Sequence, residues 1–353
     1  MGTWELVAGL SVTIEGYGLD GMETKVSSDF DRKSTVITIH GGGQIGVGED
    51  VTYDAVDHDV QQRTGPVHEL AGSWTLGDFC DHVDRLDLFA EEPVRDVSRL
   101  YRRWAFHSAA LDLALRQAGV PLHEVLGRPV RPVAFVVSVR LGEPANVDVV
   151  RSRLARYPTL RFKLDPTVSW TDRVIGQLVE TGAVDSVDFK GLYTGTVVDN
   201  PADPDLYRRV VDAFPEAWIE DPALTDETGE VLRAHHDRIT WDAPIHSVED
   251  IRALPFPPRM VNIKPSRLGG LRPLLEAYDY CAEKGIGCYG GGQFELGPGR
   301  GQNQYLASMF HPDTPNDIAP TGYNVPDPPE GLPSSPLPAA PSAIGFRWGR
   351  PSG

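Results

Sequence analysis

Three lysines follow short apolar segments in a chain that otherwise carries its positive charge on arginine. The sequence holds 6 lysines and 27 arginines, and Lys163, Lys190 and Lys264 each come directly after a strand-like run. An amine can lose its proton when it is desolvated in a cleft, whereas a guanidinium cannot. We therefore expect Lys163 and Lys264 to act as general base and conjugate acid.

Carboxylates occupy the equivalent positions between these lysines. In chain order the residues at strand ends are Lys163, Asp188, Glu220, Asp242 and Lys264, and Glu295 follows in the next unit, at spacings of 22 to 32 residues. A single acidic residue at such a position is more often a helix cap or part of a turn. Five such residues in order, each about one strand–helix unit from the next, would arise by chance far less often than a single one. Three carboxylates suit Mg²⁺, which stabilises the negative charge that develops on a substrate carboxylate when its α-proton leaves.

The second half of the chain alternates short apolar strands with amphipathic helical segments. This pattern predicts a (β/α)-barrel, in which the carboxyl ends of the strands meet at one mouth. A doubly wound sheet is the alternative, but no glycine fingerprint for a dinucleotide follows any strand. The expected strands are residues 133–138, 159–163, 184–189, 217–220, 239–242, 260–264, 286–290 and a last one near 317.

The first 120 residues predict an α+β unit instead. Strands are expected at 4–14 and 35–40, a helix from Arg99 to Ala118, and a mobile loop from Glu15 to Lys33. Glycines around Gly41–Gly43 and Gly46–Glu49 bracket a third strand. Residues 326–341 contain seven prolines and predict an extended cover over the surface. The expected domains are 1–125, completed by 324–353, and a catalytic barrel at 126–323.

Composition limits the possible partners. The net charge of −17 argues against nucleic acid and against an anionic membrane surface. Three cysteines without zinc-site spacing indicate a reducing, cytoplasmic compartment. No apolar run approaches the length of a membrane span. A small-molecule carboxylate is the expected partner. A homo-oligomer is possible, and the sequence does not decide the oligomeric state.

Taken as a set, these residues resemble the enolase superfamily, and within it the muconate-cycloisomerase-like branch. The resemblance implies a modified (β/α)₇β TIM barrel with an N-terminal α+β capping domain. It also implies one Mg²⁺ held by Asp188, Glu220 and Asp242, with Lys163 and Lys264 as the acid/base pair. The motifs that carry it are Arg161-Phe162-Lys163, Asp188, Trp218-Ile219-Glu220-Asp221-Pro222, Trp241-Asp242-Ala243-Pro244 and Asn262-Ile263-Lys264-Pro265-Ser266-Arg267-Leu268-Gly269-Gly270.

Three positions depart from the pattern of that branch. Arg161 replaces the first lysine of Lys-x-Lys, Lys190 replaces an asparagine two residues after the first metal ligand, and Ala243 replaces a glutamate. If Lys190 points into the barrel, it weakens metal binding or engages a second anionic group of the substrate; if it points outward, it has no role. The candidate substrate-binding residues are Arg161, Lys190, Ser138, Gln293, Glu295 and Asp317.

The resemblance implies a Mg²⁺-dependent enzyme that abstracts the α-proton of a carboxylate through an enediolate intermediate. Racemisation or epimerisation, cycloisomerisation and syn-elimination all fit, as in N-acylamino acid racemases and o-succinylbenzoate synthases. No histidine lies between His246 and His311, which disfavours His–Asp chemistry. Residues 316–319 lack the paired aspartates expected of a dipeptide epimerase. The alternatives are dehydration of a hydroxy acid or sugar acid on the same scaffold, and a non-catalytic anion-binding barrel with a spoiled metal site.

Overall fold

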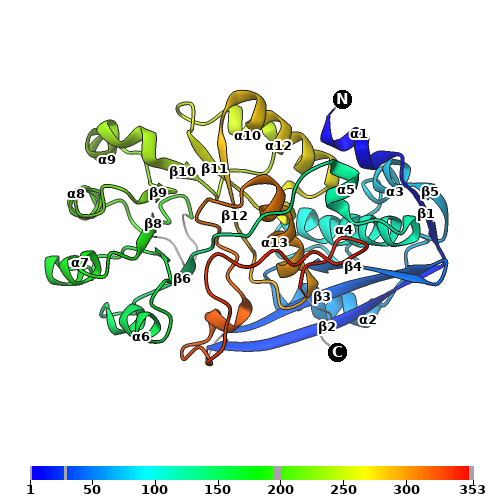
Figure 1. Ribbon diagram of the computed structural model, residues 1–353, viewed down its shortest axis with the longest axis horizontal. Helices are drawn as coiled ribbons and strands as arrows, with labels where there is room; N and C mark the ends of the chain where they lie inside the picture. The colour runs from blue at the N-terminus through cyan, green and yellow to red at the C-terminus, as the bar shows by residue number, and fades with distance from the viewer. Residues whose placement is uncertain (1, 28–29, 194–199, 350–353) are drawn as a thin grey trace.

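The computed structural model of the chain describes residues 2–27, 30–193 and 200–349. The amino-terminal part forms one α+β unit, on the right and along the lower edge of Figure 1. An antiparallel sheet of order β2-β3-β4 packs against the long helix α4, and β1 pairs with β5. Its elements are α1 (Thr3–Ala8), β1 (Ser11–Ile14), β2 (Gly16–Ser27), β3 (Phe30–Gly41), β4 (Gln44–Asp50), α2 (Ala55–Thr64), β5 (Gly72–Thr75), α3 (Leu76–Val83), α4 (Ser98–Ala118) and α5 (Leu122–Leu126).

Two expectations for this unit were wrong. The segment from Glu15 to Lys33 is not a mobile loop but β2 and the start of β3, paired in register from Gly16↔His40 to Ser27↔Phe30; positions 28–29 lie outside the described residues. Its polar and glycine residues hid the strand because one side of this hairpin is exposed. The expected strand at 4–14 begins as helix α1, and only Ser11–Ile14 is extended.

The glycines at 46 and 48 lie within β4 and not at its ends. A Cβ at Gly46 would lie 2.1 Å from the carbonyl oxygen of Ala109, and one at Gly48 would lie 2.0 Å from that of Ala105. Glycine at both positions therefore lets the backbones of β4 and α4 approach closely. The contact fixes the cap sheet on the helix that leads to the barrel.

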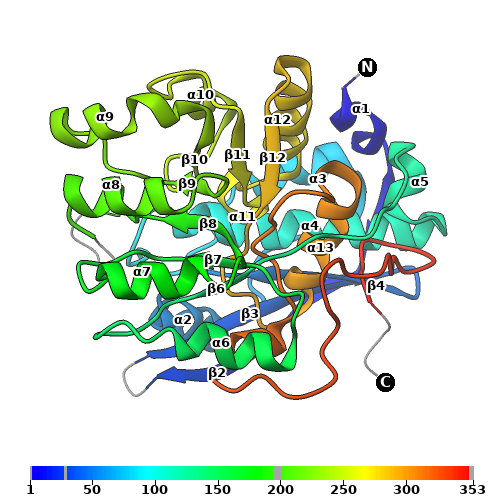
Figure 2. The same ribbon diagram turned by 60° about the vertical axis from the view of Figure 1, so that its left-hand side comes forward.

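The carboxyl-terminal part is a curved parallel sheet of order β12-β11-β10-β9-β8-β7-β6. Figure 1 shows α6 to α9 side by side on its outer face, and Figure 2 shows the same layer turned forward. The strands are β6 (Val137–Val139), β7 (Phe162–Leu164), β8 (Val184–Asp188), β9 (Trp218–Glu220), β10 (Ile239–Trp241), β11 (Met260–Ile263) and β12 (Gly287–Gly290). The helices are α6 (Asp148–Arg156), α7 (Asp172–Val179), α8 (Pro204–Ala213), α9 (Asp226–Leu232), α10 (Val248–Arg252), α11 (Pro265–Leu268), α12 (Leu271–Lys284) and α13 (Pro298–Phe310), with short 3₁₀ turns at Arg233–Arg238 and Thr321–Asn324.

The eighth strand expected near residue 317 is reduced to two isolated bridges. Asn316 pairs with Phe135 on one side, and Asp317 pairs with Gly291 on the other. These bridges join the two edges of the curved sheet, so the ring closes with seven full strands. The result confirms the predicted barrel with an α+β cap.

The proline-rich carboxyl-terminal segment, residues 326–341, contains bends and turns and winds along the surface (Figure 2). Asp112 of α4 accepts hydrogen bonds from the Phe346 amide and the Arg347 guanidinium, each at 2.8 Å. Leu337 pairs with Val133, just before β6. Through the described ranges, no helix is both long and apolar enough to cross a membrane.

Candidate active site at the barrel mouth

The strand-end residues singled out by sequence lie at the carboxyl ends of consecutive barrel strands. Lys163 is on β7, Asp188 ends β8, Glu220 ends β9, and Asp242 and Lys264 follow β10 and β11. All five are buried, with exposed fractions between 0% and 8%. Parallel strands of a barrel direct their carboxyl ends to one mouth, which explains why residues far apart in sequence meet here.

Lys163 forms one half of this site. Its Nζ donates a hydrogen bond to Glu220 Oε1, lies 3.1 Å from Asp188 Oδ2, and lies 3.5 Å from Asp317 Oδ2. Asp317 comes from the bridge that closes the barrel. The ammonium of Lys163 is thus surrounded by three carboxylates from three parts of the ring.

Lys264 and Asp242 form the other half. Lys264 Nζ donates to Asp242 Oδ2 at 2.7 Å, and Arg267 Nη1 lies 3.0 Å from Asp242 Oδ1. Arg267 is buried in α11, and Tyr193 also donates to Asp242 Oδ2 at 3.1 Å. Arg267 was quoted in the motif but given no role; three residues after Lys264, it is brought back to the strand end by the one turn of α11.

Asp221 was missed as a site residue. It adopts a left-handed backbone conformation, with φ of 44°, which turns its carboxylate toward the next strand. Its two oxygens accept the amide hydrogens of Asp242 and Ala243, each at 2.8 Å. Asp221 therefore fixes the backbone that carries Asp242. Its place directly after Glu220 was the only signal in the sequence.

The charges shift the acid strengths of these groups in opposite directions. Burial raises the pKa of Glu220 well above its ordinary value, and the Lys163 ammonium only partly offsets this effect. Burial also disfavours the ionised form of Asp188, but Lys190 and Lys163 outweigh it and hold that pKa at about 2. Burial lowers the pKa of Lys163, yet Glu220 and Asp188 more than compensate, so it lies well above the ordinary lysine value.

The carboxylates suit a hard divalent cation. Oxygen atoms of Asp188, Glu220 and Asp221 lie within 4.8 Å of one another, and all three residues are buried. Glu220 Oε2 is buried and has no hydrogen-bond partner among the described residues. Mg²⁺ prefers oxygen ligands, and Glu220 Oε2 is an oxygen that could coordinate it. The geometric group contains Asp221, whose oxygens already accept two amides; the assignment of Asp242 as the third ligand stays a prediction.

Some of the predicted substrate-binding residues lie at the barrel mouth, and others bind elsewhere. Lys190 points into the mouth: its Nζ pairs with Asp188 Oδ2, and it lies 5.1 Å from the centre of the Tyr193 ring. Asp317 contacts Lys163, as described above. Ser138, which pairs with Lys163 in the β6–β7 register, is exposed.

Arg161 and Glu295 are engaged elsewhere. The Arg161 guanidinium donates to Asp185 and to the Gly182 carbonyl. It is therefore held outside the cluster of strand-end carboxylates at the mouth. Glu295 Oε1 accepts the Gln293 amide at 2.6 Å and Asn303 Nδ2 at 3.0 Å, and Glu295 Oε2 lies 3.1 Å from Arg300. These contacts give Glu295 a part in shaping its own loop.

Several buried polar atoms near the lysines lack partners in the part of the chain that the structure describes. They are both amide atoms of Asn262 and the Tyr289 hydroxyl. Asn262 lies two residues before Lys264 and faces the same way. A Cβ at Gly291 would lie 2.5 Å from Lys264 Cε and 2.7 Å from Asn262 Oδ1. Buried polar groups without partners are rare in native proteins, so these atoms are available to a ligand.

The cap holds the loop that carries Gln293 and Glu295. Arg32 of β3, fully buried, donates to the carbonyls of Gln293 at 2.9 Å and Phe294 at 3.1 Å. Glu49 of β4 accepts the amides of Leu296, Gly297 and Gly299 at 2.7 to 3.0 Å, at the start of α13. The cap thus sets the position of one wall of the site.

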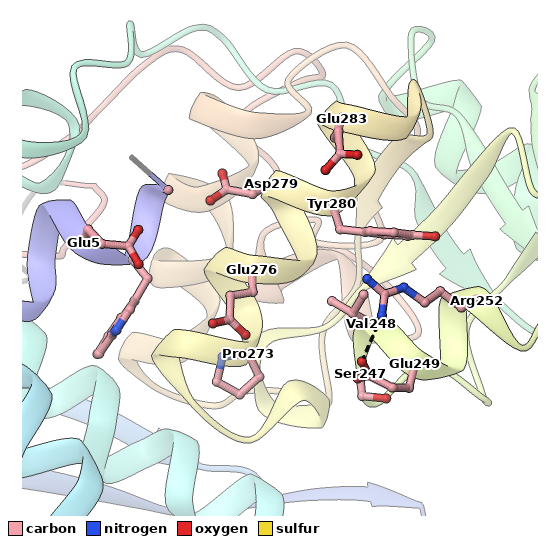
Figure 3. Close-up of a pocket in the computed structure, with 12 residues that line it drawn as sticks. Glu5, Ser247, Val248, Glu249, Arg252, Pro273, Glu276, Asp279, Tyr280 and Glu283 are labelled. Atoms are coloured by element: carbon pink, nitrogen blue, oxygen red, sulfur yellow. Dashed lines mark hydrogen bonds and ion pairs between the residues drawn. The ribbon is translucent and has the colours of Figure 1, made fainter.

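A separate groove of about 460 Å³ lies outside the barrel mouth, between α1, α10 and α12 (Figure 3). Glu5, Glu276, Asp279 and Glu283 line it, and Arg252 bonds Glu249 at its edge. None of the strand-end residues described above lines this groove. Its acidity is opposite to what a carboxylate substrate needs.

Comparisons with known proteins place the chain in a family and show what it is similar to. Residues 129–325 match the family described as the C-terminal domain of DUF8230, a domain of unknown function, and residues 5–125 match its N-terminal domain. An o-succinylbenzoate synthase from Geobacillus stearothermophilus is 26% identical over 318 residues, 83% of this chain and 79% of the relative. An N-succinylamino acid racemase from Thermus thermophilus is 27% identical over 318 residues, covering 84% and 81%.

Solved structures show the same fold. The muconate lactonizing enzyme from Pseudomonas putida superposes with a TM-score of 0.64 at 18% identity, over 95% of this chain and 96% of that one. The match extends through both the cap and the barrel. The chain therefore belongs to the DUF8230 family, and its fold is that of the muconate lactonizing enzyme.

Proposed function

We propose that this enzyme abstracts the α-proton of a small carboxylate substrate with Lys163 and Lys264, in a site that requires Mg²⁺. The observation that carries this proposal is the placement of the two lysines. Lys163 lies on β7 and Lys264 directly follows β11, four strands away, and the carboxylates at the ends of β8, β9 and β10 lie between them. In a closed barrel this separation directs two amines at a bound substrate from opposite sides.

The protein's own residues supply most of the chemistry. Asp188, Glu220 and Asp242 would hold the metal ion, which supplies positive charge to stabilise the developing enediolate. Lys163 or Lys264 takes the α-proton at its Nζ, and the other lysine returns a proton in a racemisation. Asn262 and Tyr289 offer unused polar atoms to the rest of the substrate.

Burial of both lysines excludes bulk water from the transferred proton. Lys163 is 2% exposed and Lys264 is 8% exposed. Because Glu220 and Asp188 raise the pKa of Lys163, positive charge placed among these carboxylates favours the neutral amine that a base needs. This electrostatic link is a physical reason for a metal requirement.

The reaction is tested by deuterium uptake from D₂O into a pooled set of carboxylates, read by mass spectrometry. The pool should hold N-succinylamino acids and other N-acylamino acids, hydroxy acids and lactones. We expect uptake with Mg²⁺ and none with EDTA. Release of a keto product would indicate dehydration of a hydroxy acid instead.

The ion pair between Lys190 and Asp188 is the observation that favours the second candidate, a non-catalytic barrel that binds an anion. Calorimetric titration with Mg²⁺ separates the two functions. If the protein neither binds Mg²⁺ nor catalyses deuterium uptake, the catalytic function is rejected in favour of the anion-binding function.

A further inference from the structure

Lys190 sits on a carboxylate that the proposed function assigns to the metal. Its Nζ pairs with Asp188 Oδ2, the same oxygen that Lys163 Nζ approaches at 3.1 Å. Its backbone amide donates to Asp188 Oδ1 at 3.1 Å. Both oxygens of Asp188 are therefore occupied by groups of this chain, and any divalent cation at Asp188 faces two ammonium groups.

The backbone holds Lys190 in this position against its ordinary preference. Lys190 has a φ of 54°, in the left-handed region that side chains other than glycine rarely adopt. The next residue is anchored too: the Gly191 amide donates to the Asp221 carbonyl at 3.0 Å, and a Cβ there would lie 2.3 Å from the Ala223 amide nitrogen. A strained conformation kept by its surroundings is a mark of a functional position.

Asp165 offers Lys190 a second partner. Asp165 follows Lys163 by two residues on the same face of the chain and is 9% exposed. Arg140 Nε bonds its Oδ2 at 2.9 Å, whereas its Oδ1 is buried without a hydrogen-bond partner in the described ranges. Burial raises the pKa of Asp165, and the charge of Lys190 is the strongest influence that opposes this rise.

The loops that carry Lys190 and Asp165 are tied together. Asn200 Nδ2 donates to the Pro166 carbonyl at 2.6 Å and to the Phe189 carbonyl at 3.2 Å. Pro166 and Phe189 are the neighbours of Asp165 and Lys190. The backbone around Lys190 and Asp165 is therefore held in place, while the long side chain of Lys190 can turn between the carboxylates of Asp188 and Asp165.

We propose that Lys190 is an internal counterion that competes with the divalent cation for Asp188 and transfers to Asp165 when the cation binds. This inference rests on the proposed function. It makes Lys190 and Asp165 positioning residues that set metal affinity. The unused oxygen of Asp165 compensates the ammonium that the metal displaces, so the buried charge stays paired.

The test is a double-mutant cycle read by calorimetric titration with Mg²⁺ in the absence of substrate. Lys190→Met should tighten Mg²⁺ binding at least tenfold, because it removes the competing charge. Asp165→Asn should weaken binding about threefold or more in the wild-type background and much less beside Lys190→Met, because no ammonium then needs the second partner. This difference between backgrounds separates the exchange from a general loss of charge, including the effect on Arg140.

Matched variants keep the result interpretable. Lys284→Met removes an exposed ammonium far along the chain and should leave affinity unchanged. Lys190→Arg keeps the charge and should bind Mg²⁺ much more weakly than Lys190→Met. Thermal unfolding in EDTA confirms that each variant folds.

Two outcomes contradict the inference. If wild type binds Mg²⁺ and Lys190→Met binds it no more tightly, Lys190 is not a competitor, while the proposed function stands. If Asp165→Asn has the same effect in both backgrounds, Asp165 does not receive Lys190. Failure of every variant to bind Mg²⁺ would overturn this inference together with the metal requirement.

Discussion

At the scale of single residues, position along the barrel decides which functional groups can be read from sequence. Lys163, Asp188, Glu220, Asp242 and Lys264 could be picked out because each lies near or just after the carboxyl end of a buried strand, and strand ends of a barrel share one mouth. Asp221 was not, because its direction depends on a left-handed turn at the strand end. The unpartnered side chains of Asn262 and Tyr289 could be identified only from packing.

Gly291 gives a prediction at this scale. Gly291→Ala places a methyl group 2.5 Å from Lys264 Cε and forces this lysine to move. A misplaced general base loses rate, so we expect α-proton exchange to fall by roughly a hundredfold while the protein stays folded. Circular dichroism and deuterium uptake check both parts. Gly176→Ala, where nothing lies within 4 Å of the added Cβ, is the matched control; unchanged exchange in Gly291→Ala would contradict the assigned packing.

We expect the stability of the protein to depend on pH through the buried side chain of His311. It is buried between the Tyr278 hydroxyl and Asn316 Oδ1, and burial lowers its pKa from 6.5 to about 4. The unfolded chain therefore takes up a proton first as the pH falls. Above pH 6.5 neutral His311 makes its full contribution to the free energy of unfolding. As the pH falls from 6.5 to about 4, this contribution decreases by up to ~3 kcal/mol.

Urea unfolding at several pH values measures this dependence. His311→Gln should flatten the slope between pH 6.5 and 4, and His236→Gln, which changes an exposed histidine, should not. An unchanged slope in His311→Gln would assign the dependence to other groups.

At the scale of elements, the sequence predicted the barrel strands better than the cap. Buried parallel strands such as β11, in which three of the four residues are apolar and all are buried, are easily recognised in the sequence. The β2–β3 hairpin has an exposed side rich in polar residues and glycine, so it reads as a loop until the pairing with β4 is known. The contact between β4 and α13 depends on both units and could not be read from either alone.

Glu49 supports a prediction for that contact. Glu49→Gln replaces an acceptor of three loop amides by a group that is partly a donor, so it weakens the start of α13. We expect a loss of roughly 2 kcal/mol in the free energy of unfolding. Hydrogen exchange at Leu296, Gly297 and Gly299 should become faster. Glu216→Gln, at an exposed position, is the control; equal exchange in both variants would show that Glu49 does not hold the loop.

At the scale of the whole molecule, the two-unit organisation was predictable because strand–helix alternation begins only after residue 130. The way the ring closes was not. The eighth strand survives as two bridges at Asn316 and Asp317, whose places depend on the edges of β6 and β12. The closure matters for function because it brings Asp317 to Lys163.

Metal binding should stabilise the whole molecule. The proposed cation would bind carboxylates from separate strands that meet only in the folded barrel, so Mg²⁺ at a hundred times its dissociation constant should add about 2.7 kcal/mol to the free energy of unfolding. Thermal unfolding with added Mg²⁺ and with EDTA measures the difference. Glu220→Gln should abolish the response; a response that survives in this variant would place the metal elsewhere.

The most direct test of the proposed chemistry is α-proton exchange in D₂O with Mg²⁺, compared between wild type and single lysine variants. The exposed Lys284 provides the matched control, Lys284→Ala. The account predicts that Lys163→Ala and Lys264→Ala each lower turnover by roughly a hundred- to ten-thousandfold, while Lys284→Ala behaves as wild type. Undiminished turnover in both site variants would contradict the assignment of these two lysines as the acid/base pair.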